Sequence, residues 1–144
     1  MSIPREFRLR KHAEFEVVYR CGRRHFSQIL TAFYLLRANQ SLTVAGARVG
    51  ITVGKALGKA TVRNRIKRRV RAAVTGNLSR LTRPVDVVVN PKKVALDIDF
   101  AQISSEIARA FDVIQEKAVL PEEKQSQDER NRRAEKSRIA IRNT

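Results

Sequence analysis

The sequence predicts an α/β fold in which three amphipathic helices alternate with strands. Three segments repeat apolar residues at the three- or four-residue spacing of a helix, and three others show the alternation or the β-branched density of strands. Glycine, proline or asparagine stands at most of the boundaries between these segments. With 144 residues and 42% hydrophobic side chains, the chain is long enough for one domain with one core.

The first half of the chain predicts one helix followed by strands. Residues 1–10 form a basic lead-in to a helix that ends at Cys21-Gly22. An apolar stretch at 26–36 then suits either one long strand or two short ones, and a polar turn follows it. Residues 48–53 alternate apolar and polar side chains, which predicts a half-buried strand.

Residues 60–78 form the second predicted helix, and the sequence divides it into two faces. At 100° per residue, five apolar side chains fall within one arc of roughly 120°. These are Val62, Ile66, Val70, Ala73 and Val74. Arginine, lysine and asparagine side chains occupy most of the remaining positions, so we expect one face in the core and one cationic face.

The last predicted elements are a buried strand and a third helix. The strand at 85–89 is rich in β-branched residues. Asp99 is placed to cap the helix, with Gln102 three residues later as in a capping box. The chain then becomes charged and lacks aromatic residues, so we predict a domain at 1–120 and a disordered charged tail at 121–144.

Positive charge is concentrated in one window of the chain. The formal net charge is +16, and residues 17–85 contain fifteen Lys or Arg but no Asp or Glu. A carboxylate within about 8–10 Å of a bound phosphate would repel it. So complete an exclusion of carboxylates indicates a polyanionic partner, namely nucleic acid. The alternative is a peripheral membrane protein, but its cationic stripe would include Trp, Phe or Leu for insertion, and this one does not.

Other features of the composition exclude several classes of protein. Cys21 is the single cysteine, which excludes an internal disulfide and a cysteine-based zinc site. No apolar run approaches the ~20 residues needed to span a bilayer. The first residues lack the apolar segment of a signal peptide. We therefore expect a soluble, cytoplasmic protein.

The densest basic segment surrounds the start of the second predicted helix. It contains eight cations and no acid: Lys55, Lys59, Arg63, Arg65, Lys67, Arg68, Arg69 and Arg71. Cations three residues apart lie about one helical turn apart, where like charges destabilise an isolated helix by a few tenths of a kcal/mol per pair. A phosphate backbone would relieve this repulsion and accept bidentate bonds from arginine. The alternative is a solvated helix face, but such a face usually carries compensating acids.

The same segment resembles the protein subunit of bacterial ribonuclease P. The resemblance rests on Arg48-Val49-Gly50-Ile51, then Lys55 and Gly58, and then Val62-Arg63-Asn64-Arg65-Ile66-Lys67-Arg68-Arg69-Val70-Arg71. The Arg-Asn-Arg core followed by Lys-Arg and a further Arg is that family's signature. In element order the resemblance covers about residues 5–117, and it is most specific over 48–71.

The resemblance implies a specific architecture. The family has an α+β sandwich like that of some ribosomal proteins, with a four-stranded mixed sheet and the element order helix, strands, helix, strand, helix. The connection through its basic helix joins parallel strands by a left-handed crossover, against the general right-handed rule. The basic helix contacts the catalytic RNA, and a central cleft between the first helix and the sheet holds the 5′ leader of precursor tRNA.

The resemblance also implies roles for particular residues. The RNA-binding positions would be Arg63, Asn64, Arg65, Lys67, Arg68, Arg71, Lys55, Lys59 and Arg48. The leader-binding cleft would contain Phe15, Tyr19 and Tyr34, for each of which ordinary core packing is the alternative. Arg23 and Arg24 would extend the cationic track. Independently, the helical wheel places these helix residues away from the core arc, except that Arg63 flanks the arc, as Arg69 does.

The sequence offers no convincing nuclease site of its own. A self-contained nuclease usually needs a carboxylate cluster for metal ions or a histidine acid–base pair. His12 and His25 are more typical of surface residues or RNA contacts, and Asp97 with Asp99 would make a poor metal site. The resemblance implies instead that the RNA subunit is the catalyst, using Mg²⁺ bound through RNA and substrate, and that the protein is an accessory subunit.

Three other functions remain as alternatives. A ribosomal protein or RNA chaperone fits the composition equally well, although it would have no need of an aromatic cleft. A helix-turn-helix DNA-binding protein would need a helix just before residue 60, where a strand is predicted. A standalone nuclease would have to depend on Asp97 and Asp99. The partners that the resemblance implies are the catalytic RNA and precursor tRNA, without membrane or DNA.

Overall fold

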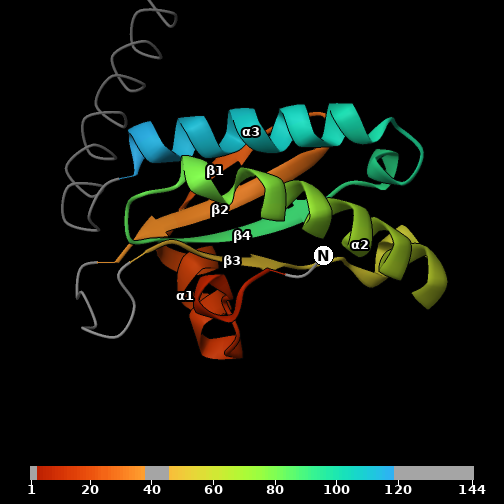
Figure 1. The fold of residues 1–144 in the computed structure, drawn as a ribbon. Helices are drawn as coiled ribbons and strands as arrows, with labels where there is room; N and C mark the ends of the chain where they lie inside the picture. Colours follow the sequence, from red (N-terminus) through yellow and green to blue (C-terminus); the bar gives the residue numbers. More distant parts are fainter. Residues whose placement is uncertain (1–2, 38–45, 119–144) are drawn as a thin grey trace, which may run out of the picture.

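Helices cover both faces of a four-stranded sheet in this protein (Figure 1). The structure is a computed structural model that describes residues 3–37 and 46–118. The predicted tail at 121–144 lies outside the described residues, as does most of the turn predicted before residue 48. Within the described ranges, no helix is both long and apolar enough to span a membrane.

The element order agrees with the predicted order of helix, strands, helix, strand, helix. The helices are α1 (His12–Cys21), α2 (Ala60–Asn77) and α3 (Phe100–Lys117). The strands are β1 (Arg23–Phe26), β2 (Leu30–Leu36), β3 (Arg48–Ile51) and β4 (Val85–Pro91). Short 3₁₀ helices η1 (Arg5–Phe7), η2 (Lys55–Leu57), η3 (Leu78–Arg80) and η4 (Lys93–Leu96) lie between them. The predicted α/β class and the order of elements are thus confirmed.

The sheet is mixed, and its strands lie in the order β1-β2-β4-β3. β1 and β2 form an antiparallel hairpin, β2 also pairs antiparallel with β4, and β3 pairs parallel with β4. The apolar stretch at 26–36 therefore contains one full strand, and its hairpin partner begins earlier than predicted. β1 has little strand signal in its residues because this edge strand is Arg-Arg-His-Phe, with charged side chains of the kind that protect sheet edges.

The two faces of the sheet are covered differently. α2 and α3 lie on one face and α1 on the other (Figure 1). The α2/α3 face holds the larger apolar cluster, which includes Ile66, Val70 and Phe111. The α1 face holds a small cluster of Leu9, Val18, Leu35 and Val88. Successive side chains along a strand therefore point alternately into the larger cluster on the α2/α3 face and the smaller cluster on the α1 face.

The predicted two-faced character of α2 is confirmed. Ile66, Val70, Ala73 and Val74 are buried, while Val62 packs half-buried at the margin of the core. The chain enters this helix through Gly58, whose φ of 138° is a conformation that side chains with a Cβ rarely adopt. The predicted face of α2 thus anchors the helix to the sheet.

The start of α3 differs from the prediction in its capping. Asp99 does occupy the N-cap position, but its side chain makes no capping hydrogen bond, so the predicted capping box is wrong. The next residue, Phe100, is 46% exposed. Ile103, Ile107 and Ile114 are buried and fix the helix to the core.

Candidate nucleic-acid interface

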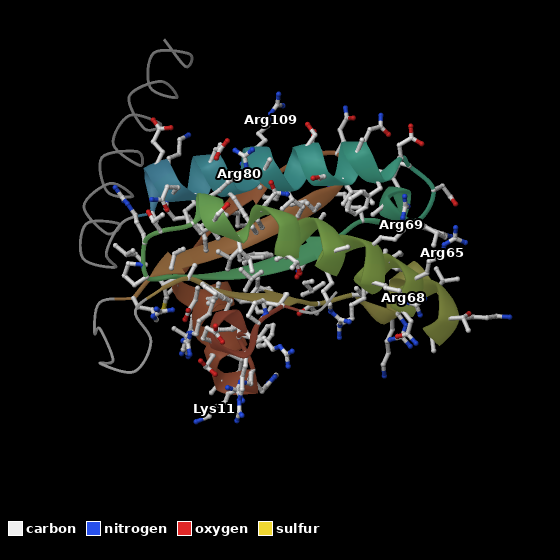
Figure 2. The ribbon with its side chains drawn as sticks, in the orientation of Figure 1. Lys11, Arg65, Arg68, Arg69, Arg80 and Arg109 are labelled. Carbon is white, nitrogen blue, oxygen red and sulfur yellow. The ribbon has the colours of Figure 1, made fainter. Side chains whose placement is uncertain are left out.

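The outward face of α2 carries a group of exposed cations. Asn64, Arg65 and Arg68 are exposed, and Figure 2 shows the two arginines projecting from the N-terminal half of the helix. Among residues 3–37 and 46–118, no salt bridge involves a cation of α2. Lys55 in η2 and Lys59 at the N-cap are also exposed, so the predicted cations gather at one end of the helix.

Three further predicted residues of α2 lie nearer the sheet. Arg63, Lys67 and Arg71 are half-buried, and the Nε atom of Arg63 is buried without a hydrogen-bond partner in the part of the chain that the structure describes. Lys67 and Arg71 both line a hollow that reaches β3. The cationic surface therefore turns from the exposed side of α2 toward the sheet.

Arg69 belongs to the same charge run but turns inward. Its Nη1 atom donates to the carbonyl oxygens of Ala95 and Leu96, at 2.6 and 2.7 Å, and its Nη2 atom donates to that of Ile98. These acceptors lie in and just after η4. Arg69 therefore fastens the connection before α3 to α2, and its place beside the core arc of the helical wheel is consistent with that structural role.

Arg48 requires a correction, because its guanidinium is occupied inside the protein. It donates to both carboxylate oxygens of Asp86, at 2.9 and 2.7 Å, and also pairs with Glu14. Arg37 donates to the same Asp86 carboxylate at 2.6 Å. Hydrogen bonding to Asp86 raises the pKa of Arg48 above its ordinary value. We therefore move Arg48 from the predicted RNA-binding set to a buried network that joins α1 to the sheet.

A groove of about 390 Å³ connects the cationic helix with the α1 face of the sheet. Its lining combines apolar and cationic side chains: Ile3, Leu9, Phe15, Val49, Gly50 and Ile51 with Arg8, Arg10, Lys67 and Arg71. A Cβ atom at Gly50 would lie 2.4 Å from the Phe15 ring, so the glycine lets this ring lie against β3. Arg8 and Arg10 were not predicted as site residues, and their only sequence signal was the basic character of residues 1–10.

Tyr34 does not lie in this cleft, and the strand aromatic on the α1 face is Phe33. Tyr34 is 3% exposed and belongs to the cluster on the α2/α3 face. Burial raises the pKa of its hydroxyl, an effect that nearby Arg23 opposes. Phe33 packs with Phe15 and Tyr19 against the cluster beneath α1. The predicted element was right, but a shift of one residue along a strand moves the side chain to the opposite face.

The aromatic residues on the α1 face are held in fixed positions. The Tyr19 hydroxyl donates to Asn90 Oδ1 at 3.0 Å, and its ring meets Phe33 edge-on with 4.8 Å between the ring centroids. The Arg24 guanidinium lies over the Phe33 ring, 5.6 Å from its centroid. Phe15, Tyr19 and Phe33 together with Arg24 form what we call the aromatic platform.

The described residues bring together no group of three or more His, Cys, Asp or Glu side chains that could hold a metal ion. His12 is exposed and lies 3.0 Å from Glu16 on α1. His25 lies on β1, where burial lowers its pKa below the ordinary value. Asp97 and Asp99 are exposed beside η4.

Comparison with known proteins decides the family. The sequence model of the family described as Ribonuclease P matches residues 3–115. The chain belongs to the ribonuclease P protein family. A search of the curated proteins found no match. The family accounts for the fold and for the signature on α2.

Solved structures of bacterial members are similar in fold. The ribonuclease P protein of Staphylococcus aureus, in a mutant described as having defective mRNA degradation activity, gives a TM-score of 0.65 at 25% identity, covering 76% of this chain and 88% of that one. The ribonuclease P protein of Thermotoga maritima gives a TM-score of 0.63 at 25% identity, covering 73% and 94%. The chain is thus a bacterial ribonuclease P protein component, a subunit of an endoribonuclease that processes tRNA.

Proposed function

We propose that this subunit binds the catalytic RNA of ribonuclease P through α2 and holds the 5′ leader of precursor tRNA on the aromatic platform. The RNA then performs Mg²⁺-dependent hydrolysis that removes the leader and leaves a mature 5′ end. The observation that carries the proposal is a set of α2 cations that pair with no acid within residues 3–37 and 46–118. This set adjoins a groove that leads to an aromatic surface.

The spacing of the cations on α2 is more favourable when they face an RNA backbone than when they face solvent. Arg65 and Arg68 stand one turn apart on the same side of the helix and repel one another in the free protein. A phosphate backbone converts that repulsion into attraction, and the planar arginine side chains bind phosphate oxygens in pairs. Assembly with RNA therefore relieves a strain in the free protein.

The aromatic platform suits an unpaired strand of variable sequence. Every base has a π face, so stacking on aromatic side chains contributes about 1–3 kcal/mol per base without demanding a particular base. Phe33 and Tyr19 are positioned by mutual packing and by Asn90, which reduces the entropy lost when RNA binds. A mature tRNA lacks the leader and cannot use the platform, so the protein favours substrate over product.

The protein's contribution to Mg²⁺ chemistry would be indirect. The exposed cations of α2 are poor neighbours for a metal ion, so Mg²⁺ would be bound by RNA and substrate. By neutralising phosphates near the cleavage site, these cations reduce repulsion between the two RNA molecules. The holoenzyme should therefore need less Mg²⁺ than the RNA alone.

The decisive experiment assembles the purified protein with a bacterial ribonuclease P RNA at low Mg²⁺ and follows cleavage of a precursor tRNA at the leader junction. Arg65→Ala and Arg68→Ala should each weaken assembly and reduce the slope of log affinity against log salt by about one. The matched control is Arg109→Ala on α3, which removes an equally exposed arginine from a different surface (Figure 2). Equal effects of all three substitutions would reject α2 as the interface.

A second experiment tests the platform. Phe33→Ala should lower affinity for precursor tRNA by about tenfold and leave affinity for mature tRNA unchanged, because only the precursor has a leader. Equal losses for both RNAs would remove the platform from the proposal. A protein that promoted no cleavage but bound many RNAs equally would instead be an RNA chaperone.

A further inference from the structure

One exposed aromatic residue stands beyond the aromatic platform. Phe26 is the last residue of β1 and is 66% exposed. Alternation along β1 puts Phe26 on the same face as Arg24, whose guanidinium covers Phe33. Phe26 pairs with Thr31 and Arg24 with Phe33, so Phe26 lies diagonally beside Phe33, at a separation of roughly 7–8 Å. That separation allows neighbouring bases of one strand to reach both rings.

The strand pairing shows which residues lie in one row with Phe26 across the sheet. Thr31 faces Phe26 on one side and Asn90 on the other, and Asn90 holds the Tyr19 hydroxyl. The row adjacent to it contains Arg24, Phe33, Val88 and Gly50, one from each strand. Because neighbouring strands lie about 4.8 Å apart, this row spans about 14 Å from Gly50 on β3 to Arg24 on β1. Phe26 is therefore at the end of the sheet farthest from the groove beside α2.

The end of the hairpin holds Phe26 rigidly and adds positive charge. Ser27 Oγ accepts hydrogen bonds from the backbone N–H groups of Ile29 and Leu30, at 3.2 and 3.1 Å, which fixes the turn. The Lys92 ammonium donates to the carbonyl oxygen of Ser27 at 2.6 Å and so stays next to Phe26. The exposed Phe26 ring has Arg24 two residues before it on the same strand and the Lys92 ammonium at the carbonyl of the next residue. An aromatic ring with cations nearby suits a stacked base and the adjacent phosphates of single-stranded RNA.

We propose that Phe26, with Arg24 and Lys92, forms an outer subsite for single-stranded RNA that binds leader nucleotides beyond those held at Phe33. This inference rests on the proposed leader binding and deepens it. A leader that crosses from the α2 edge to the β1 edge reaches Phe26 only when it is long enough. The outer subsite therefore makes substrate affinity increase with leader length beyond the range that Phe33 alone would explain.

The test measures binding of the holoenzyme to precursor tRNAs whose leaders are lengthened one nucleotide at a time. Phe26→Ala should bind short leaders like the native protein and lose about tenfold in affinity for long ones. Phe26→Trp should retain the higher affinity for long leaders, because it keeps an aromatic face. The matched control is Phe100→Ala, which removes another exposed phenylalanine from α3, on the opposite face of the sheet. That control should bind leaders of every length normally.

A fluorescent base analogue placed at successive leader positions locates each subsite. Phe26→Ala should abolish stacking at a position farther from the cleavage junction than the position affected by Phe33→Ala. If Phe26→Ala changes nothing while Phe33→Ala still weakens precursor binding, the outer subsite is refuted and the proposed function stands. If Phe26→Ala weakens assembly regardless of leader length, Phe26 contacts the catalytic RNA and the inference is wrong. If neither substitution affects precursor binding, leader binding itself fails.

Discussion

Two groups of arginines from one acid-free window of the sequence serve opposite purposes. Arg48 and Arg69 turn inward, to a buried carboxylate and to backbone carbonyls. Arg65 and Arg68 turn outward and meet no acid among the described residues. Composition alone treats the four alike. The comparison shows that part of the positive charge holds the fold together, and only the remainder is available for RNA.

The inward group explains how a strongly cationic chain can fold. Asp86 is 6% exposed and lies between β2 and β3, where the register places Leu35 and Arg48 on either side of it. Two arginines satisfy its oxygens, and Glu14 adds a contact from α1. A buried ion network of this kind contributes little over a well-packed apolar one, but removing one member takes a charged partner from the others.

The largest effect should come from Asp86→Ala, which leaves Arg37 and Arg48 facing each other without the shared carboxylate. We expect the free energy of unfolding to fall by about 3–5 kcal/mol, measured by urea denaturation. Asp86→Asn keeps an acceptor and should cost less. A loss below about 1 kcal/mol for the alanine variant would mean that solvent screens this network and that it does not organise the α1 face.

Two neighbours on α2 give a sharper test of the same comparison. Arg69→Ala removes hydrogen bonds to the carbonyls of η4 and should lower the free energy of unfolding by about 2–3 kcal/mol. Arg68→Ala should change it by less than about 0.5 kcal/mol, while weakening RNA binding. Thermal unfolding of both variants measures the loss of stability, and RNA titration measures the loss of binding. Similar stability for the two variants would erase the distinction between inward and outward arginines.

The order of elements could be predicted because periodicity and turn residues are local signals. The core face of α2 followed directly from the spacing of Ile66, Val70 and Val74. The partner of each arginine could not be predicted, because Arg48 meets Glu14 and Asp86 only after three separate elements have assembled. Asp86, the first acid after the window, and Glu14, which lies shortly before it, are thus structural partners of Arg48 without any local sign of this in the sequence.

In the candidate site, too, the sequence could not predict a contact that depends on how separate elements pair. Tyr34 and Phe33 are adjacent aromatic residues on one strand, and only the pairing of β2 with β4 decides which of them faces α1. Both faces of this strand are buried, so hydrophobic alternation did not distinguish them. Phe15 and Tyr19 were identified through the family resemblance, as two aromatic residues four apart on the first helix, a spacing that places both on one face. The residues on helices were therefore predicted better than those on strands.

A smaller effect is expected for the exposed pair of Arg80 and Asp112. Its nitrogen and oxygen atoms lie 3.0 Å apart, but the side chains are 44% and 60% exposed. Asp112→Ala should lower the free energy of unfolding by no more than about 1 kcal/mol, and less at high salt. Urea denaturation at two salt concentrations measures both values. A loss as large as that of Asp86→Ala would show that burial does not govern the strength of these pairs.

The smallest effect should come from His25, whose pKa is lowered by burial in the folded protein. Burial lowers its pKa below 6.5; Glu106 on α3 opposes this shift, while Lys117 and Arg109 reinforce it. The unfolded chain therefore binds a proton at a pH where the folded protein does not, so stability is full above about pH 6.5 and decreases as the pH falls toward the lowered pKa. His25→Gln should flatten this part of the stability profile. His12→Gln, on exposed α1, should leave the contribution of His25 in place, because His12 lies on a different element. A profile equally steep with and without His25 would assign the pH dependence to other groups.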